Sequence, residues 1–180
     1  MSVDRHKWLN LPYDCRLAFS RHMDMQERSF SADAPYVPKE GKLPAFMNRA
    51  VEQSRRYRAL PLYMSFQAYG REGFQRIFEE NCRFAHRLSE WVDATSDFEH
   101  LAETQLNIIC FRGRYAEAEA DAQNRALLKR INGSRRLFIT PTTYNGHFCY
   151  RLAFSNWQTS DSDLATVTDT LIEADRSATA

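Results

Sequence analysis

The chain has 180 residues, of which 43% are hydrophobic and 13% aromatic, and its 24 basic residues nearly balance its 23 acidic ones. This composition supports a globular core and excludes a disordered chain, and the charge balance argues against nucleic acid as the main partner. No stretch has the roughly 20 apolar residues that cross a membrane, so we expect no membrane partner. The four cysteines are scattered without a C-x-x-C pair, which indicates reduced thiols and a cytoplasmic location.

The first half of the chain is predicted to hold a short β element, an irregular segment and helices. Residues 8–20 alternate loosely in hydropathy, which predicts a strand or a strand-turn-strand element. Residues 20–42 are polar and contain two prolines and a glycine, which predicts a long irregular segment, and such segments are often functional. A helix is expected over 54–70 with Gly70 at its end. Apolar residues at three-and-four spacing predict another helix over 71–93.

The second half alternates between strands and helices. "TQLNIICFRG" (104–113) predicts a strand, and 115–133 predicts a helix that stops at Asn-Gly. "RLFIT" (136–140) and "HFCYRLAFS" (147–155) predict two strands joined by the turn residues "PTTYNG". A terminal helix follows Ser160, which begins a capping-box pattern.

Side chains on a strand alternate between its two faces. In the last strand this alternation places Arg151 opposite an apolar face formed by Phe148, Tyr150, Leu152 and Phe154.

From residue 71 the order of elements is helix, strand, helix, strand, strand, helix. This order predicts an α+β domain with helices packed on one face of a small antiparallel or mixed sheet. Residues 1–55 do not fit that sandwich and resemble the trailing edge of another domain. We therefore expect two parts, 1–55 and 56–180.

Lys7 is the first candidate for chemistry. It lies between His6 and Trp8, two flat groups that can pack on a planar cofactor, and an apolar run follows that could desolvate its amine. A lysine near a terminus is more often simply solvated. Cys82 and His86 have a spacing that can hold a metal on a helix, but two ligands do not make a site, and no metal is expected.

Several ordered segments resemble the group II pyridoxal-phosphate decarboxylases, the family of the aromatic-amino-acid, histidine and glutamate decarboxylases. "VDRHKWLNLPYDC" is similar to the family's cofactor-lysine segment, and "DAPYVP" to its mobile catalytic loop. "SRRYRALPLYMSFQAYGREGF" resembles the helix that follows, and "YRLAFSNWQTSDSD" the final strand and helix. The resemblance implies a fold-type I enzyme, with 1–55 as the end of the cofactor-binding large domain and 56–180 as a linking helix and the C-terminal small domain.

The resemblance also implies roles for four residues. Lys7 matches the lysine that bonds covalently to the aldehyde of pyridoxal 5'-phosphate, and His6 matches a histidine close to the cofactor phosphate. Tyr36 matches the loop tyrosine that returns a proton to the substrate α-carbon, and Arg151 a strand arginine that meets a substrate carboxylate. Two alternatives stay open: Tyr36 could be an ordinary packed tyrosine, and Arg151 could pair with a carboxylate on the next strand.

The implied reaction is loss of the α-carboxylate of an L-amino acid, with an aromatic one favoured, to give an amine. The implied partner is a second copy in a homodimer, or a complementing large-domain chain. The family's chains are much longer, and the residues that hold the pyridine ring and the phosphate are not among these 180. We therefore expect this chain alone to be inactive. The alternative is a non-catalytic remnant that serves as a dimerisation or interaction module; a transaminase is a weaker third possibility.

Overall fold

The computed structural model describes residues 1–13, 15–31, 46–52 and 54–176. The chain forms two compact units, Met1–Gly70 and Arg71–Ala180, and each is described by itself. The predicted domain boundary between residues 55 and 56 stays a prediction, because the two units are defined only by contacts inside this chain.

The first unit begins with a small antiparallel hairpin that surrounds Lys7. Strand β1 (Ser2–Asp4) pairs with strand β2 (Arg16–Ala18), and the four-residue helix α1 (Arg5–Trp8) follows β1 directly. The predicted strand or strand-turn-strand element over 8–20 is therefore wrong for most of its length, since β2 is the only strand among its described residues. Lys7 lies on a helical turn between two strands, rather than in front of one.

Helix α2 (Met23–Phe30) corrects the prediction that 20–42 is irregular throughout. The short 3-10 helix η1 (Phe46–Arg49) follows later in the chain. Nε of Arg49 pairs with Oε1 of Glu27 at 2.9 Å, and the side-chain amide of Gln26 donates to the carbonyl of Arg49. These contacts hold α2 and η1 against each other. No side chain of α2 is buried, and the helix has only eight residues, so the polar composition around it hid this short element.

Helix α3 (Leu60–Ala94) is interrupted at Gly70, where φ is 59° and ψ is −172°. Only glycine adopts this backbone conformation readily. The predicted helix end at Gly70 is confirmed, as is the predicted helix over 71–93. The division between the two units falls at the same glycine.

The second unit is built on a four-stranded antiparallel sheet in the order β3-β4-β6-β5. Its strands are β3 (Phe98–Gln105), β4 (Ile108–Gly113), β5 (Thr140–Tyr144) and β6 (His147–Ala153). The predictions of β4 and β6 are confirmed. Strand β3 was missed, and β5 lies later than predicted, over residues first assigned to the turn.

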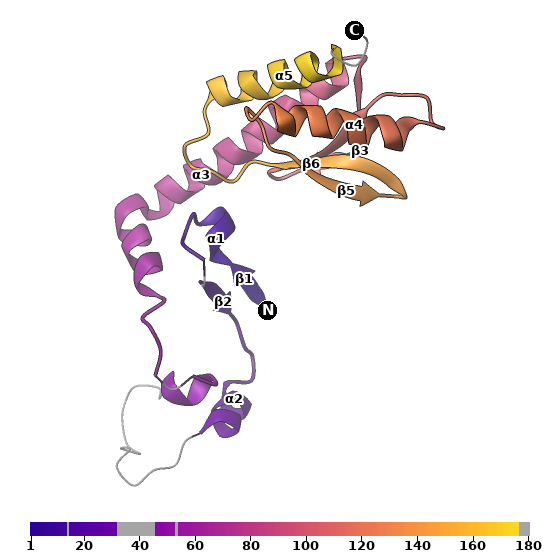
Figure 1. Cartoon of the computed structure of the whole chain (residues 1–180). Coiled ribbons are helices and arrows are strands. Elements are labelled where there is room, and N and C mark those ends of the chain that lie inside the picture. Colours follow the sequence, from indigo (N-terminus) through magenta and orange to yellow (C-terminus); the bar gives the residue numbers. More distant parts are fainter. Residues whose placement is uncertain (14, 32–45, 53, 177–180) are drawn as a thin grey trace. The chain divides into compact units, whose positions relative to one another are not determined.

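Helices α4 (Ala120–Gly133) and α5 (Asp161–Arg176) complete this unit. At the start of α5 the backbone N–H and the hydroxyl of Ser160 donate to Oδ2 of Asp163 over 2.8 and 2.7 Å, which confirms the predicted cap. One continuous core joins the last part of α3, both of these helices and one face of the sheet. The three helices lie on the same side of the sheet (Figure 1), so the predicted α+β fold is confirmed.

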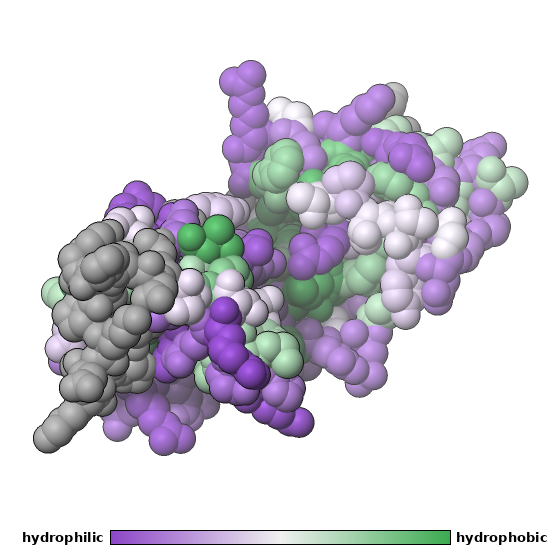
Figure 2. Space-filling model, turned by 90° about the horizontal axis from the view of Figure 1, so that it is seen from below, coloured by the Kyte–Doolittle hydropathy of each residue, from purple (hydrophilic) through white to green (hydrophobic). Residues whose placement is uncertain are grey.

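The predicted apolar face is confirmed: Phe148, Tyr150 and Leu152 on β6, and Phe154 directly after it, are all buried. Hydrophilic residues make up most of the surface seen from below, with hydrophobic residues in smaller groups among them (Figure 2). None of the helices in the described part of the chain is both long enough and apolar enough to span a membrane.

Candidate active site

Lys7 lies on α1 with its amine held by an acidic neighbour. Its Nζ donates to Oδ2 of Asp4 over 3.1 Å, and the other oxygen of that carboxylate lies 2.7 Å from Nε of Arg16. The Lys7 side chain is 61% exposed, so a ligand in solution can reach its amine. Arg16 is also exposed, and as the direct β-partner of Asp4 it is accommodated on the open side of the hairpin.

The contact with Lys7 changes the pKa of the Asp4 carboxylate. The pKa of Asp4 is held below its ordinary value, chiefly by the hydrogen bond from Lys7; desolvation opposes this effect, and the positive charge of Arg16 adds a smaller lowering. An amine attacks a carbonyl only after it loses a proton. Asp4 occupies the Lys7 amine with a hydrogen bond, so a carbonyl ligand has to displace this contact before it can react there.

His6, on the same helical turn, stacks on an aromatic ring. The ring centroids of His6 and Tyr13 are 4.3 Å apart, with an angle of 21° between the planes. Sequence reasoning missed both Asp4 and Tyr13. The first could have been found, because it lies three residues before Lys7, a helical spacing. Tyr13 could not have been found from the sequence, because its contact with His6 depends on a turn with positive φ at Asn10.

Tyr36 lies outside the described residues. The elements on either side of that segment, α2 and η1, contact each other through the Glu27–Arg49 ion pair. The segment that contains Tyr36 therefore starts and ends at two elements, α2 and η1, that contact each other.

Arg151 is exposed on the outer face of β6, as predicted. Its direct neighbours across the sheet are Cys110 on β4 and Thr140 on β5, and neither can form an ion pair with it. Among the described residues Arg151 forms no salt bridge, in contrast to the alternative that it pairs with a carboxylate on the next strand. Lys7 and His6 thus share α1 in the first unit, and Arg151 belongs to the second.

The outer face of the sheet also carries a charged cluster that sequence reasoning missed. Arg112 is only 8% exposed, and its guanidinium lies 2.6 Å from Glu99 and 3.1 Å from Glu117. Nδ1 of His147 lies 3.2 Å from the same Glu117. The strand register places Glu99 opposite Arg112, whereas Glu117 reaches both Arg112 and His147 from the turn that follows β4.

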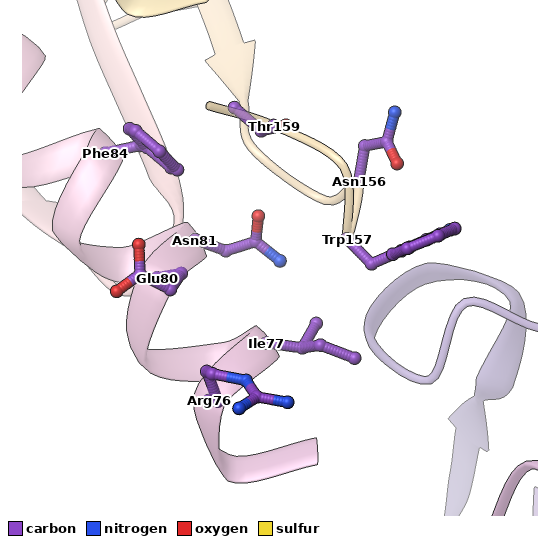
Figure 3. Close-up of a pocket in the computed structure, with 8 residues that line it drawn as sticks. All are labelled: Arg76, Ile77, Glu80, Asn81, Phe84, Asn156, Trp157 and Thr159. Carbon is purple, nitrogen blue, oxygen red and sulfur yellow. The ribbon is translucent and has the colours of Figure 1, made fainter. Parts of the chain in front are cut away.

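A separate pocket of about 120 Å³ lies in the second unit between α3 and the segment before α5 (Figure 3). The side chain of Asn81 points into it, and its buried Nδ2 has no hydrogen-bond partner among the described residues. None of the predicted site residues lines this pocket. Within the described structure, no three His, Cys, Asp or Glu side chains are grouped closely enough to hold a metal ion.

The chain belongs to the pyridoxal-dependent decarboxylase family, because residues 1–114 match the conserved domain that defines this family. Its curated relatives include aromatic-L-amino-acid decarboxylases. That of Drosophila melanogaster is 29% identical over 88% of this chain, and that of Sus scrofa is 28% identical over 82%. This chain spans only about a third of those proteins, 31% and 30% of their lengths.

Solved structures of similar fold cover nearly the whole chain. The structure of Oryza sativa TDC with PLP and tryptamine has a TM-score of 0.89 at 23% identity, and covers 98% of this chain and 38% of that one. Catharanthus roseus tryptophan decarboxylase in complex with L-tryptophan has a TM-score of 0.87 at 24% identity, with coverage of 98% and 37%. At this level of identity the likeness establishes the fold alone.

The residues of α1 fit the covalent attachment of the family's cofactor. Pyridoxal phosphate carries an aldehyde, and Lys7 offers an exposed primary amine. His6 lies on the same turn with one ring face stacked on Tyr13, which fixes the orientation of its imidazole. The fit is limited to this point of attachment and its immediate neighbours.

Proposed function

We propose that this chain supplies the cofactor lysine and the C-terminal small domain of a pyridoxal-phosphate-dependent L-amino-acid decarboxylase. The proposed reaction releases the α-carboxylate as carbon dioxide and gives an amine, and aromatic amino acids are the favoured substrate class. The observation that carries the proposal is the position of Lys7, which lies inside the family match and presents an exposed amine on a short helical turn.

The cofactor supplies an electron sink when it is bound. Lys7 would anchor it, and Asp4 would orient the Lys7 amine through the 3.1 Å contact. His6 would lie near the cofactor phosphate, with its ring held by Tyr13. Tyr36 would return a proton to the substrate α-carbon after carbon dioxide leaves, which determines that an amine is released.

Arg151 would bind a carboxylate of the substrate. Two properties of its setting support this role: the guanidinium is exposed, and the neighbouring side chains across the sheet are a thiol and a hydroxyl rather than acids. An arginine without an internal partner can form a bidentate contact with a carboxylate ligand.

We also propose that the working enzyme is a homodimer, or a complex with a complementing large-domain chain, and that it is cytoplasmic. The cytoplasmic assignment is supported by the four free cysteines, which include the Cys110–Cys149 pair. The 180-residue chain alone is expected to have little or no turnover, because it spans about a third of its curated relatives.

Borohydride trapping tests the central step. The purified chain is incubated with pyridoxal phosphate, reduced and digested, and the phosphopyridoxyl label is located by mass. We expect a near-stoichiometric label at Lys7 that is lost in Lys7→Arg. Lys129→Arg is the matched control, because Lys129 is an exposed lysine on α4, and it should leave the label unchanged.

Two other results would contradict the proposed decarboxylase function. A faint label spread over all lysines would mean that Lys7 is an ordinary surface amine and would favour a non-catalytic interaction module. A strong Lys7 label with no amine formed from any amino acid, even after a large-domain chain of the family is added, would support cofactor binding without catalysis. In a reconstituted enzyme, Arg151→Gln should raise KM for the amino acid, whereas Arg71→Gln on exposed α3 should not.

A further inference from the structure

Two cysteines from neighbouring strands meet on the outer face of the sheet. Sγ of Cys110 on β4 lies 3.3 Å from Sγ of Cys149 on β6. Both residues are free thiols, and they are 39 positions apart in the sequence. They lie diagonally across one strand pair, because Cys110 is directly opposite Arg151 in the register.

The separation suits chelation by one atom better than a direct bond. A disulfide needs its sulfurs about 2.05 Å apart, so these two sulfurs are not bonded. Two bonds of about 2.3 Å, a usual length for a thiolate bound to a soft centre, span about 3.3 Å when they meet near a right angle. Trivalent arsenic is strongly thiophilic, and its pyramidal bonds meet at about such an angle.

We propose that Cys110 and Cys149 form a dithiol site that chelates a single trivalent arsenical or a comparable soft, thiophilic centre. The strand pairing holds both thiols in place, so the second bond forms without further ordering of the chain. With an arylarsenic oxide, two S–H bonds and the arsenic–oxygen bonds break, and two As–S bonds form. The oxygen and both protons leave as water, and arsenic stays trivalent, so no oxidant is required.

The two thiols differ in accessibility, which sets the order of reaction. Cys110 is partly exposed, whereas Cys149 is fully buried and its thiol also lies 3.7 Å from the carbonyl of Thr142. Burial, with a contribution from the hydrogen bond with Cys110, raises the pKa of Cys149 to about 12. Cys110 therefore reacts first, and Cys149 closes the chelate as a neutral thiol that releases its proton to water.

The other two cysteines provide the internal comparison. Cys15 is buried in the first unit, and its Sγ donates to the carbonyl of Arg58 over 3.2 Å. Cys82 lies on α3, where burial raises its thiol pKa. In the described structure neither has another cysteine as a hydrogen-bond partner, so each can form only one bond to arsenic, and a monothiol in excess removes such an adduct.

The test uses the 180-residue chain and phenylarsine oxide. The reagent is added in equal amount, glutathione is added in excess, and intact mass under non-denaturing conditions measures the retained 1:1 adduct. We expect the wild type and the Cys15→Ser/Cys82→Ser variant to retain the adduct, and dithiothreitol to remove it. Cys110→Ser should lower retention at least about tenfold, because the second, intramolecular bond is lost.

Two outcomes overturn the proposal: equal retention in the wild type and in Cys110→Ser, or loss of retention in Cys15→Ser/Cys82→Ser. Cys149→Ala is the second single variant and should behave like Cys110→Ser. Because Cys149 is buried, its variant is first compared with the wild type by circular dichroism. If it does not fold, partly exposed Cys110 decides the result alone, since a serine there is tolerated near the surface.

Discussion

Nζ of Lys7 donates to the carboxylate of Asp4 across 3.1 Å, so the lysine proposed to bond the cofactor begins as one half of an ion pair. The partner is three residues earlier, at the last position of β1, and that strand is held by β2. The local hairpin thus controls the charge environment of the amine. This relationship gives the first prediction.

Replacing Asp4 by Asn should make Lys7 more reactive. The substitution removes the ion pair that occupies the Lys7 amine but keeps the size of the side chain at position 4. We expect the initial rate of pyridoxal phosphate labelling at Lys7 at pH 7.5 to rise about two- to fivefold, the range for an exposed ion pair. Asp24→Asn, which removes the exposed Asp24–Arg28 pair, is the control and should leave that rate unchanged. An unaltered rate in Asp4→Asn would show that the contact does not govern the amine.

The cap of α5 predicts a defined pH dependence of stability. The pKa of Asp163 lies below its ordinary value, because the hydroxyl of Ser160 and then its backbone N–H donate to the carboxylate. A lowered pKa stabilises the folded state above the unfolded value, about 3.9, and this stabilisation disappears as the pH falls through the folded value.

Urea unfolding of the wild type and Asp163→Asn, followed from pH 7 to pH 2, measures this effect. The wild type should have the higher midpoint at pH 7, and the two midpoints should converge below about pH 3. Asp169→Asn, an exposed position on the same helix, should track the wild type throughout. A constant difference across the whole range would mean that the carboxylate charge is not what caps the helix.

Gly113 should not tolerate even a methyl group. A Cβ at this position would lie 2.7 Å from a ring carbon of Tyr115 and 3.2 Å from Oδ1 of Asn124. We expect Gly113→Ala to lower the free energy of unfolding by about 1–3 kcal/mol through overpacking. Gly133→Ala, at the end of α4 with no atom within 4 Å of the added carbon, should be neutral or slightly stabilising. Equal effects in thermal or urea unfolding would contradict this explanation.

Asn124 and Tyr150 should prove energetically coupled. Asn124 is fully buried, exchanges hydrogen bonds with the backbone of Gly113, and accepts from the hydroxyl of Tyr150 over 2.6 Å. Asn124→Ala leaves several buried groups without partners and should cost about 2–4 kcal/mol, whereas Tyr150→Phe should cost about 1–2 kcal/mol. In a double-mutant cycle measured by urea unfolding, the two effects should not add; strict additivity would rule out the network.

The parts of the fold that the sequence predicted are those with strong apolar patterning. Strand β6 has a large apolar residue at every second position, and the second half of α3 has a clear apolar stripe, so both were located correctly. Strand β3 was missed because it is an edge strand with mostly polar residues, of which only Phe98 and Thr104 are buried. Edge strands need little hydrophobic pattern, because one side has no strand partner.

In the candidate site, too, local sequence patterns predicted some residues, whereas contacts formed by the fold could not be predicted. Lys7 and His6 could be identified from a local motif, and the outward direction of Arg151 from the alternation in β6. The neighbours that give these residues their setting could not be found in the same way. The pairing of Cys110 with Cys149 and the stacking of His6 on Tyr13 depend on strand register and on a turn, which no short motif encodes.

The alternation in β6 also has an evolutionary consequence. Inward residues such as Tyr150 and Leu152 maintain the core, while exposed Arg151, on the opposite face, can change without altering its packing. Selection can therefore act on ligand preference and on folding at adjacent positions almost independently. If Arg151 binds the substrate carboxylate as proposed, this position can change its ligand while Tyr150 and Leu152 on either side keep the domain intact.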